Sequence, residues 1–523
     1  MKPVLMAVIG GCLVFWAGTV GATSYKPSAA PVRPATSTGA LARTSDDPNP
    51  LAALEHGLRP NVLPAGVGAP GWSLAERMRH HNVPGVAIAV VRNGEVVSAV
   101  GYGVREAGTQ DAVDGDTVFS VGSISKVTTA TTTLRLVAQG RLDLDRDVGD
   151  YLARWMLPPT PEGSQPRVSL RMLMSHTSGF GVHGFADYQP HEPLPTLVQV
   201  LDGQAPAKGE AVRSINAPGL VQDYSGGGVT VEQLVLEDAT GRSLSDLAAA
   251  EVFAPLGMRR STFESPLSAG HGNIARAHDA AGAPTALPRG WESFGEGGAS
   301  GLWTSANDLG RLVSGLIRSY QGQSDFLPQP LATAMMTEVS PSSFGLGPKL
   351  GGAGLGRHFF HLGANQSYRA FMEGYPETGD GFVILTNGAN GDQLVAEIRN
   401  ALADAIGLGA HAPVQAVALR LPPSPDYAGR YRLDPAVPMD VRRALPDSFD
   451  YESFQVNVTD GAVEVVLPGQ DEPTLLSPLG PAHFVQSGLY TFGFEFRRDA
   501  WNRVRGVTVS MPEANSVAYY ARE

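Results

Sequence analysis

Residues 119–126 read Phe-Ser-Val-Gly-Ser-Ile-Ser-Lys, which places Ser123 three residues before Lys126. Side chains three residues apart share one face of a helix, so the lysine amine is expected beside the serine hydroxyl. A desolvated lysine can lose its proton, whereas an arginine cannot, and such an amine can act as the base for a serine. The spacing predicts Ser123 as a nucleophile and Lys126 as its base.

Lysine is rare in this chain, and that gives the pair more weight. The sequence has 34 arginines and five lysines, the lysines at positions 2, 26, 126, 208 and 349. A chance match to Ser-x-x-Lys is less frequent in such a composition. On this tetrad alone, a solvated surface pair of Ser123 and Lys126 stays open as the alternative.

The flanking sequence extends the pattern. Residues 86–91 and 95–100 are predicted strands joined by Asn93-Gly94, a strong hairpin signal. Apolar residues at helical spacing predict a helix from the tetrad to Gly140. This order resembles the serine β-lactamase and penicillin-binding protein superfamily, in its class C-like branch of esterases, D-aminopeptidases and DD-carboxypeptidases. The resemblance covers residues 84–408 and implies an α+β (coarsely α/β), β-lactamase/transpeptidase-like fold, an antiparallel sheet flanked by helices.

The resemblance implies a second catalytic group at Tyr224, in the run Gln-Asp-Tyr-Ser-Gly-Gly-Gly of residues 222–228. The family has a Tyr-x-Asn loop there, whose tyrosine passes the proton to the leaving group. Simple packing is the alternative for any single tyrosine. Gly226 stands where the family has its asparagine. That asparagine helps to hold the amide side chain of β-lactams, so its absence argues against efficient β-lactamase activity.

The third family element corresponds to His361, Leu362, Gly363 and Ala364. Lactamases and cell-wall peptidases usually carry lysine at the first position, whereas many related esterases and aminopeptidases carry histidine. A histidine of ordinary pKa, about 6.5, has only a partial charge at neutral pH. We therefore expect less acidic substrates, or a site that strengthens below neutrality. The resemblance also implies an oxyanion hole formed by N–H groups of this strand and of Ser123.

Other motifs are interpreted as structural. Residues 175–179, Ser-His-Thr-Ser-Gly, resemble a family signature at a helix end, and residues 351–356 form a glycine-rich loop without the features of a nucleotide site. The 12 histidines show no metal-ligand spacing, and His358 with His361 is a poor pair on a strand. We expect no metal and no cofactor.

The chain divides into four parts. Residues 1–22 are predicted to be a signal peptide, with lipidation at Cys12 or an uncleaved anchor as alternatives, so the protein is expected to be exported to the periplasm or the medium. Residues 23–60 are rich in proline, alanine and serine and predict a flexible linker. Residues 61–410 are the expected hydrolase domain. Short alternating runs in residues 415–523 predict a small β-barrel, which resembles lipocalin-like domains.

The composition limits the partners. A net charge of −12 and a pI near 5.5 argue against nucleic acid, and no other segment could cross a membrane. We expect an exported serine hydrolase that cleaves an ester or amide bond of a small-molecule or peptide substrate, cell-wall fragments included, through an acyl-enzyme on Ser123. An esterase or D-amino-acid-type peptidase fits best. A slowly deacylating β-lactam sensor and a true class C-type β-lactamase are the alternatives.

Overall fold

The computed structural model describes residues 35–36, 49–189, 191–285, 291–434, 436, 449, 451–468, 473–488, 490–511 and 516–523. The predicted signal peptide lies outside these residues. Within the described part of the chain, no helix is both long and apolar enough to span a membrane.

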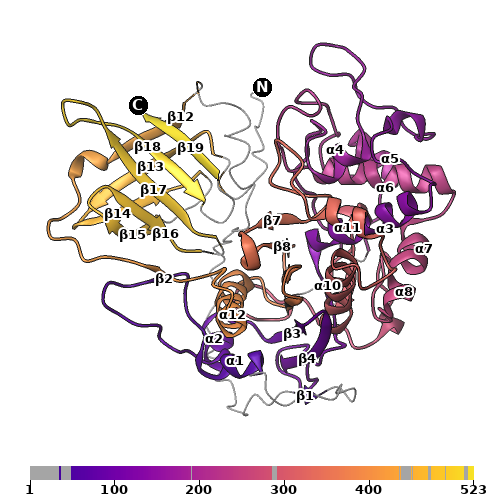
Figure 1. Ribbon diagram of the computed structural model, residues 1–523, viewed down its shortest axis with the longest axis horizontal. Coiled ribbons are helices and arrows are strands. Elements are labelled where there is room, and N and C mark those ends of the chain that lie inside the picture. Colours follow the sequence, from indigo (N-terminus) through magenta and orange to yellow (C-terminus); the bar gives the residue numbers. More distant parts are fainter. Residues whose placement is uncertain are drawn as a thin grey trace.

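Among the described residues, helices and strands are mixed up to β11, and mainly strands follow it (Figure 1). The helices, with η for short 3₁₀ or π turns, are η1 Pro50–Ala52, α1 Ala53–His56, α2 Leu74–His80, η2 Gly122–Ile124, α3 Ser125–Ala138, η3 Val148–Asp150, α4 Leu170–Met174, α5 Leu197–Asp202, α6 Gly226–Thr240, α7 Leu244–Ala248, η4 Ala249–Phe253, α8 Ala254–Leu256, η5 Ala269–His271, α9 Gly297–Ser300, α10 Ala306–Tyr320, α11 Gln329–Met335, η6 Gly354–Gly356, α12 Gly391–Ile406 and η7 Pro425–Tyr427. The strands are β1 Ala35–Thr36, β2 Val62–Leu63, β3 Gly85–Arg92, β4 Glu95–Gly103, β5 Val118–Ser120, β6 Trp303–Ser305, β7 Lys349–Gly351, β8 His358–Ala364, β9 Arg369–Tyr375, β10 Asp380–Thr386, β11 Val414–Gln415, β12 Gly429–Leu433, β13 Ser453–Thr459, β14 Ala462–Val466, β15 Thr474–Gly480, β16 His483–Gln486, β17 Phe492–Arg498, β18 Val504–Met511 and β19 Ser516–Arg522.

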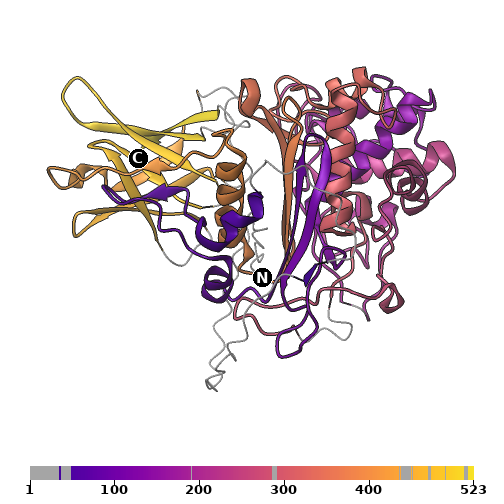
Figure 2. The same ribbon diagram turned by 60° about the horizontal axis from the view of Figure 1, so that its bottom comes forward.

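The central layer is an antiparallel sheet of seven strands in the order β1-β4-β3-β10-β9-β8-β7. The Asn93-Gly94 hairpin is confirmed: both residues have positive φ, as a primed two-residue turn requires. Strands β9 and β10 are buried along their whole length because the sheet is covered on both faces. Helix α10 covers one face, and α12 with α1 and α2 covers the other (Figure 2). The predicted α+β, β-lactamase/transpeptidase-like class is therefore confirmed.

Helix α3 begins at Ser125, two residues after Ser123, and carries five threonines that are poor helix formers. All five are completely buried, and four of their hydroxyls donate to the carbonyl four residues earlier. Those bonds satisfy four of the five buried hydroxyls inside the helix itself, whereas that of Thr128 has no hydrogen-bond partner among the described residues. Packing, rather than propensity, therefore holds the helix that carries the nucleophile.

Strands β12 to β19 form a closed barrel in which the eight strands follow one another in chain order. Along β13, buried and partly exposed residues alternate, and the buried side chains point into the barrel. Its interior is filled by stacked and edge-on aromatic rings, among them Tyr431, Phe454, Phe494 and Tyr520. The C-terminal β-barrel that the alternation predicts is present.

Residues 49–60 differ from the expectation of a flexible linker over residues 23–60. Residues 50–56 form η1 and α1, and Leu54 and Leu58 are buried in the same cluster as α12 and the barrel. Arg59 pairs with Asp404 and also donates to the carbonyl of His411 at 2.6 Å. The sequence did not predict this segment, because two short helical turns show little hydrophobic periodicity and the surrounding composition is rich in proline.

A buried carboxyl group between α3 and α6 makes stability depend on pH. Glu232 accepts a hydrogen bond from Thr133 at 2.6 Å, and burial raises its pKa from 4.5 to about 8. Folded protein therefore holds a proton that the unfolded chain releases, so unfolding free energy should fall as pH rises from about 4.5 to about 8. Glu232→Gln keeps the acceptor for Thr133 and should raise stability at pH 8 by about 1–3 kcal/mol. Urea unfolding at pH 5 and pH 8 measures this, and an equal gain at both values would contradict it.

Candidate active site

Ser123 lies in the turn η2, between strand β5 and helix α3. The preceding residue, Gly122, has φ +47, a left-handed conformation that glycine adopts without strain. A Cβ on Gly122 would lie 2.8 Å from the carbonyl oxygen and 2.9 Å from the nitrogen of Ala364. Glycine therefore allows the turn and the end of β8 to touch.

Lys126 is aimed at Ser123. Its Nζ donates to Ser123 Oγ at 3.0 Å and to the carbonyl oxygen of Ala299, in α9, at 2.9 Å. Lys126 is only 3% exposed, and its Nζ lies 4.9 Å from the centroid of the Tyr224 ring. The solvated surface pair that the tetrad alone left open is thus not what the structure shows.

The end of β8 supplies a second N–H beside Ser123. Asn365 N donates to Tyr368 O at 3.3 Å where β8 turns into β9. In an antiparallel pair of strands, the N–H groups of successive residues point alternately toward the partner strand and away from it. Because the N–H of Asn365 points toward β9, that of Ala364 points away from β9. On that side lies the turn of Gly122 and Ser123. The N–H groups of Ser123 and Ala364 are placed to hold an oxyanion between them.

Tyr224 precedes α6 and lies among rings that come from three other segments. The centroid of its ring is 4.4 Å from that of His176, 4.8 Å from that of His183 and 6.3 Å from that of His361. Lys126 and Tyr224 are therefore neighbours, as the resemblance implies. The structure brings together six of the seven candidate residues from the three sequence elements: Ser123, Lys126, Tyr224, His361, Gly363 and Ala364. The side chain of Leu362 instead packs on the other face of the sheet, in the cluster that contains Phe371 and α12.

His176, from the motif interpreted as structural, supports the loop of Tyr224. Its Nδ1 accepts from the backbone N–H of Ser225 at 3.2 Å, and its carbonyl accepts from that of Asp223 at 2.8 Å. Burial, and Lys126 next, lower its pKa well below the ordinary range, so the ring is a neutral acceptor. Sequence reasoning identified the helix end but not the contact with Tyr224, because 48 residues separate the two side chains.

His361 is in the predicted place, but its charge differs from the expectation. It is 3% exposed, and its Nδ1 lies 2.6 Å from the carbonyl oxygen of Leu362. Burial, with the nearby cations Lys126 and Lys349, lowers its pKa to about 3. The expected partial charge at neutral pH is wrong, because desolvation and like charges both disfavour the imidazolium ion. Its Nε2 is buried and has no hydrogen-bond partner among the described residues.

The space beside Gly226 explains why no asparagine stands there. A Cβ at Gly226 would lie 2.9 Å from the carbonyl oxygen of His183 and 3.1 Å from the ring of Phe185. The segment 181–185 is bonded to the start of α6 through the backbone N–H groups of Gly226 and Gly227. This segment occupies the volume that a longer side chain would need.

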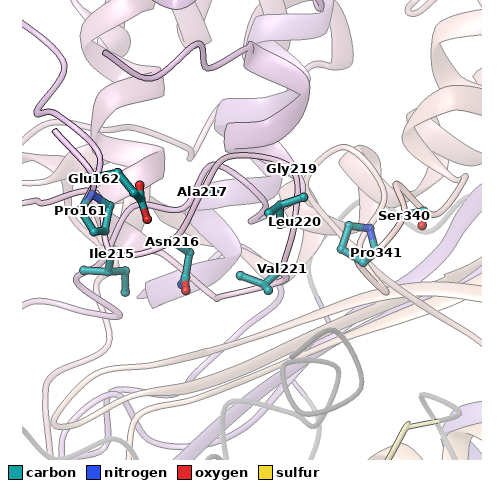
Figure 3. A pocket seen from close by; sticks show the side chains of 10 residues that line it. All are labelled: Pro161, Glu162, Ile215, Asn216, Ala217, Gly219, Leu220, Val221, Ser340 and Pro341. Atoms are coloured by element: carbon teal, nitrogen blue, oxygen red, sulfur yellow. The ribbon is translucent and has the colours of Figure 1, made fainter. Parts of the chain in front are cut away.

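A cavity of about 730 Å³ opens beside these elements rather than at the nucleophile. The loop of residues 215–221 and the turn at Ser340 and Pro341 line it, together with Pro161 and Glu162 (Figure 3). None of the candidate catalytic residues lines this cavity. Asn216, on its wall, donates to Asp223 at 3.1 Å, one residue before Tyr224.

A model of the beta-lactamase family matches residues 73–406, more than half of the chain. The chain belongs to the beta-lactamase family. It is therefore a serine hydrolase of that family, as the Ser-x-x-Lys tetrad predicts. The match begins at the residue before α2 and ends with α12, and so it excludes the barrel.

Two curated relatives carry the names of hydrolases. Esterase EstB of Burkholderia gladioli is 30% identical over 316 residues, which are 54% of this chain and 76% of the esterase. A D-aminopeptidase of Brucella canis is 29% identical over 192 residues, which are 35% of this chain and 33% of that protein. The first match spans three quarters of the relative and the second spans one third.

Among solved structures, SurE with D-Leu resembles the chain at a TM-score of 0.52. The sequences are 21% identical, and the match covers 86% of this chain and 97% of SurE. At this identity the likeness shows the fold alone. It extends beyond the residues that the family model matches.

Proposed function

We propose that the protein is an esterase or D-amino-acid-type peptidase that acts through an acyl-enzyme on Ser123. The observation that carries the proposal is the 3.0 Å contact between Lys126 Nζ and Ser123 Oγ in a buried site. Lys126 in its neutral form takes the proton of Ser123 as Oγ attacks the carbonyl carbon, and Tyr224 passes that proton from Lys126 to the leaving oxygen or nitrogen. The N–H groups of Ser123 and Ala364 hold the oxyanion, and water then hydrolyses the acyl-enzyme.

The surroundings of Ser123 favour an acyl group without a carboxylate. The position that holds a lysine in lactamases is here a neutral His361, whose pKa lies at about 3. A neutral imidazole offers no charge to a substrate carboxylate. Segment 181–185 also fills the place of the missing asparagine side chain. Both features support an esterase or D-peptidase over a dedicated β-lactamase.

Replacing His361 tests the missing charge. Because His361 stays neutral, the preference of the native protein between neutral and carboxylate-bearing esters should not change from pH 8 to pH 5. His361→Lys should improve kcat/KM for the carboxylate-bearing ester about 10-fold relative to that for the neutral ester. This ratio corresponds to about 1.4 kcal/mol of additional interaction between the lysine and the carboxylate. His361→Gln is the neutral control. A preference that rises toward pH 5 in the native protein, or no gain for His361→Lys at any pH, would contradict the assignment.

A group of carboxyls favours substrates with a free amine, the D-amino-acid branch of the proposal. Glu296 is buried beside Lys126 and Asp187, and burial raises its pKa to about 8. Burial, together with Glu292, also raises the pKa of Asp187 to about 7. An ammonium group next to these carboxyls would offset the cost of ionising them. Comparing kcat/KM for D-alanine esters with free and with acetylated amines tests this preference. Equal values for the two esters would contradict the D-amino-acid-type peptidase and leave an esterase as the proposed activity.

The deciding experiment is the intact mass of the protein, acid-quenched seconds after mixing with an activated ester or with a penicillin. We expect a Ser123-dependent acyl adduct from the ester with continued turnover, and none in Ser123→Ala. A lasting penicillin adduct after one equivalent of product would favour the β-lactam sensor instead. Rapid, repeated penicillin hydrolysis would favour a β-lactamase.

We also propose that the protein is exported. Support comes from the charged start, the apolar stretch and the small residues that end at Ala22. N-terminal sequencing of the mature protein should begin at Thr23. A start at Cys12 would indicate lipidation, and an intact Met1 would indicate a retained anchor.

A further inference from the structure

Two histidines and a glutamate meet on the face of the sheet that is remote from Ser123. Nitrogens of His358 and His411 and a carboxylate oxygen of Glu373 all lie within 4.8 Å of one another. His411 Nε2 is 2.9 Å from Glu373 Oε2 and 3.1 Å from Oε1. His358 is 4% exposed and Glu373 is fully buried. These side chains form the His-Glu-His cluster.

The strand register builds this cluster. Glu373 in β9 pairs with Phe360 in β8, so His358, two residues along from Phe360, points to the same face as Glu373. His361, three residues from His358, points to the opposite face, toward Tyr224. His358 and His361 therefore cannot share a metal. The third member, His411, comes from the connector between α12 and β11.

The surroundings orient each member. His358 Nδ1 lies 2.9 Å from the carbonyl oxygen of Gly356, so it carries the proton and leaves Nε2 with a lone pair. The hydroxyl of Tyr375 donates to Glu373 Oε1. The backbone of His411 is held by Arg59, which donates to its carbonyl. A carbonyl-bound imidazole and a hydroxyl-bound carboxylate are the arrangements that orient ligands around metal ions.

We propose that the His-Glu-His cluster is a structural binding site for a zinc-class divalent metal ion. Two imidazoles and one carboxylate form a recurrent zinc donor set. Tetrahedral zinc with bonds of about 2.1 Å places its ligand atoms about 3.4 Å apart, so small ring rotations close the present spacing. Arg399 acts on His411 and Tyr375 as a nearby cation. That charge disfavours calcium or magnesium, whose binding is mainly electrostatic, and favours an ion that bonds directionally to imidazole.

The ion would tie three parts of the chain together. Strand β8 carries His358 on one face and His361 on the other, while His411 belongs to the connector that leads to the barrel. Figure 2 shows α12 and the barrel on the same side of the sheet. Bound metal would fix the connector to the strand whose end supplies Ala364 to the candidate oxyanion hole. The site thus stabilises the fold and takes no part in the reaction.

Calorimetric titration of zinc into the full-length protein, after removal of metals with a chelator, tests the proposal. We expect one equivalent of zinc to bind, the thermal midpoint to rise with zinc concentration, and calcium to do neither. Cobalt should give the intense visible bands of a four-coordinate ion. His411→Ala should bind zinc at least about 10-fold more weakly, whereas His56→Ala, at an exposed histidine of α1, should bind it unchanged.

His358→Gln serves as a second variant should His411→Ala fail to fold, with far-UV circular dichroism and ester hydrolysis as checks of folding. Absence of stoichiometric zinc binding to the native protein would overturn the proposal. So would zinc binding that survives both substitutions, or a cobalt complex with only the weak bands of a six-coordinate ion. None of these outcomes bears on acylation of Ser123, so the site and the proposed function stand or fall separately.

Discussion

Replacing Lys126 with methionine should lower kcat for an activated ester about 10²–10⁴-fold, the range expected for loss of a positioned general base. Methionine has a similar length and an apolar character, so it suits a position that is only 3% exposed. It removes the donor to Ser123 Oγ and to the Ala299 carbonyl. KM should change little, because Lys126 contacts the nucleophile rather than an acyl pocket.

The matched control is Lys208→Met. Lys208 pairs with Glu192 at 2.6 Å on a partly exposed surface. Because Lys208 also donates to the carbonyl of Asp187, the control is read on an ester without an amine. Loss of Lys208 should leave kcat for that ester unchanged and remove at most about 1 kcal/mol of stability. Steady-state kinetics and urea unfolding of both variants separate catalysis from folding. If Lys126→Met kept more than a tenth of native kcat while folded, Lys126 would not be the base.

The tetrad and the hairpin could be predicted because their signals are local. The spacing of Ser123 and Lys126 depends on a single helical turn, and the Asn93-Gly94 turn depends on two residues with positive φ. Alternation along residues 454–458 likewise predicted a barrel strand, which is β13. Each of these features is decided by neighbours in the chain, so tertiary packing had little to add.

Features decided by distant segments could not be predicted. The charge of His361 depends on burial and on Lys126 and Lys349, which the sequence alone does not place near it. The His-Glu-His cluster joins residues 358, 373 and 411, whose separations match no metal-binding motif. The helical turns at residues 50–56 could not be predicted for a different reason. The segment is too short to show the hydrophobic periodicity of a helix.

Substituting alanine for Gly363 should lower kcat about 10²–10³-fold, comparable to the loss of one oxyanion donor. A Cβ there would lie 1.8 Å from the carbonyl oxygen of Val121 and 3.2 Å from the nitrogen of Ser123. Two atoms cannot share that space, so β8 must move away from the nucleophile turn. The N–H of Ala364 moves with the strand and no longer shares an oxyanion with that of Ser123.

Gly68→Ala is the matched control, because a Cβ at Gly68 meets no atom within 4 Å and its φ is not positive. Gly363→Ala should also cost about 1–3 kcal/mol of stability, as expected for overpacking. A loss of stability alone would reduce the fraction of folded enzyme, and the observed rates of acylation and deacylation would fall by that same fraction. A displaced oxyanion hole instead slows the chemical steps in enzyme that is fully folded. Single-turnover rates of the folded variant therefore decide the matter: native rates would mean that Ala364 lies outside the oxyanion hole.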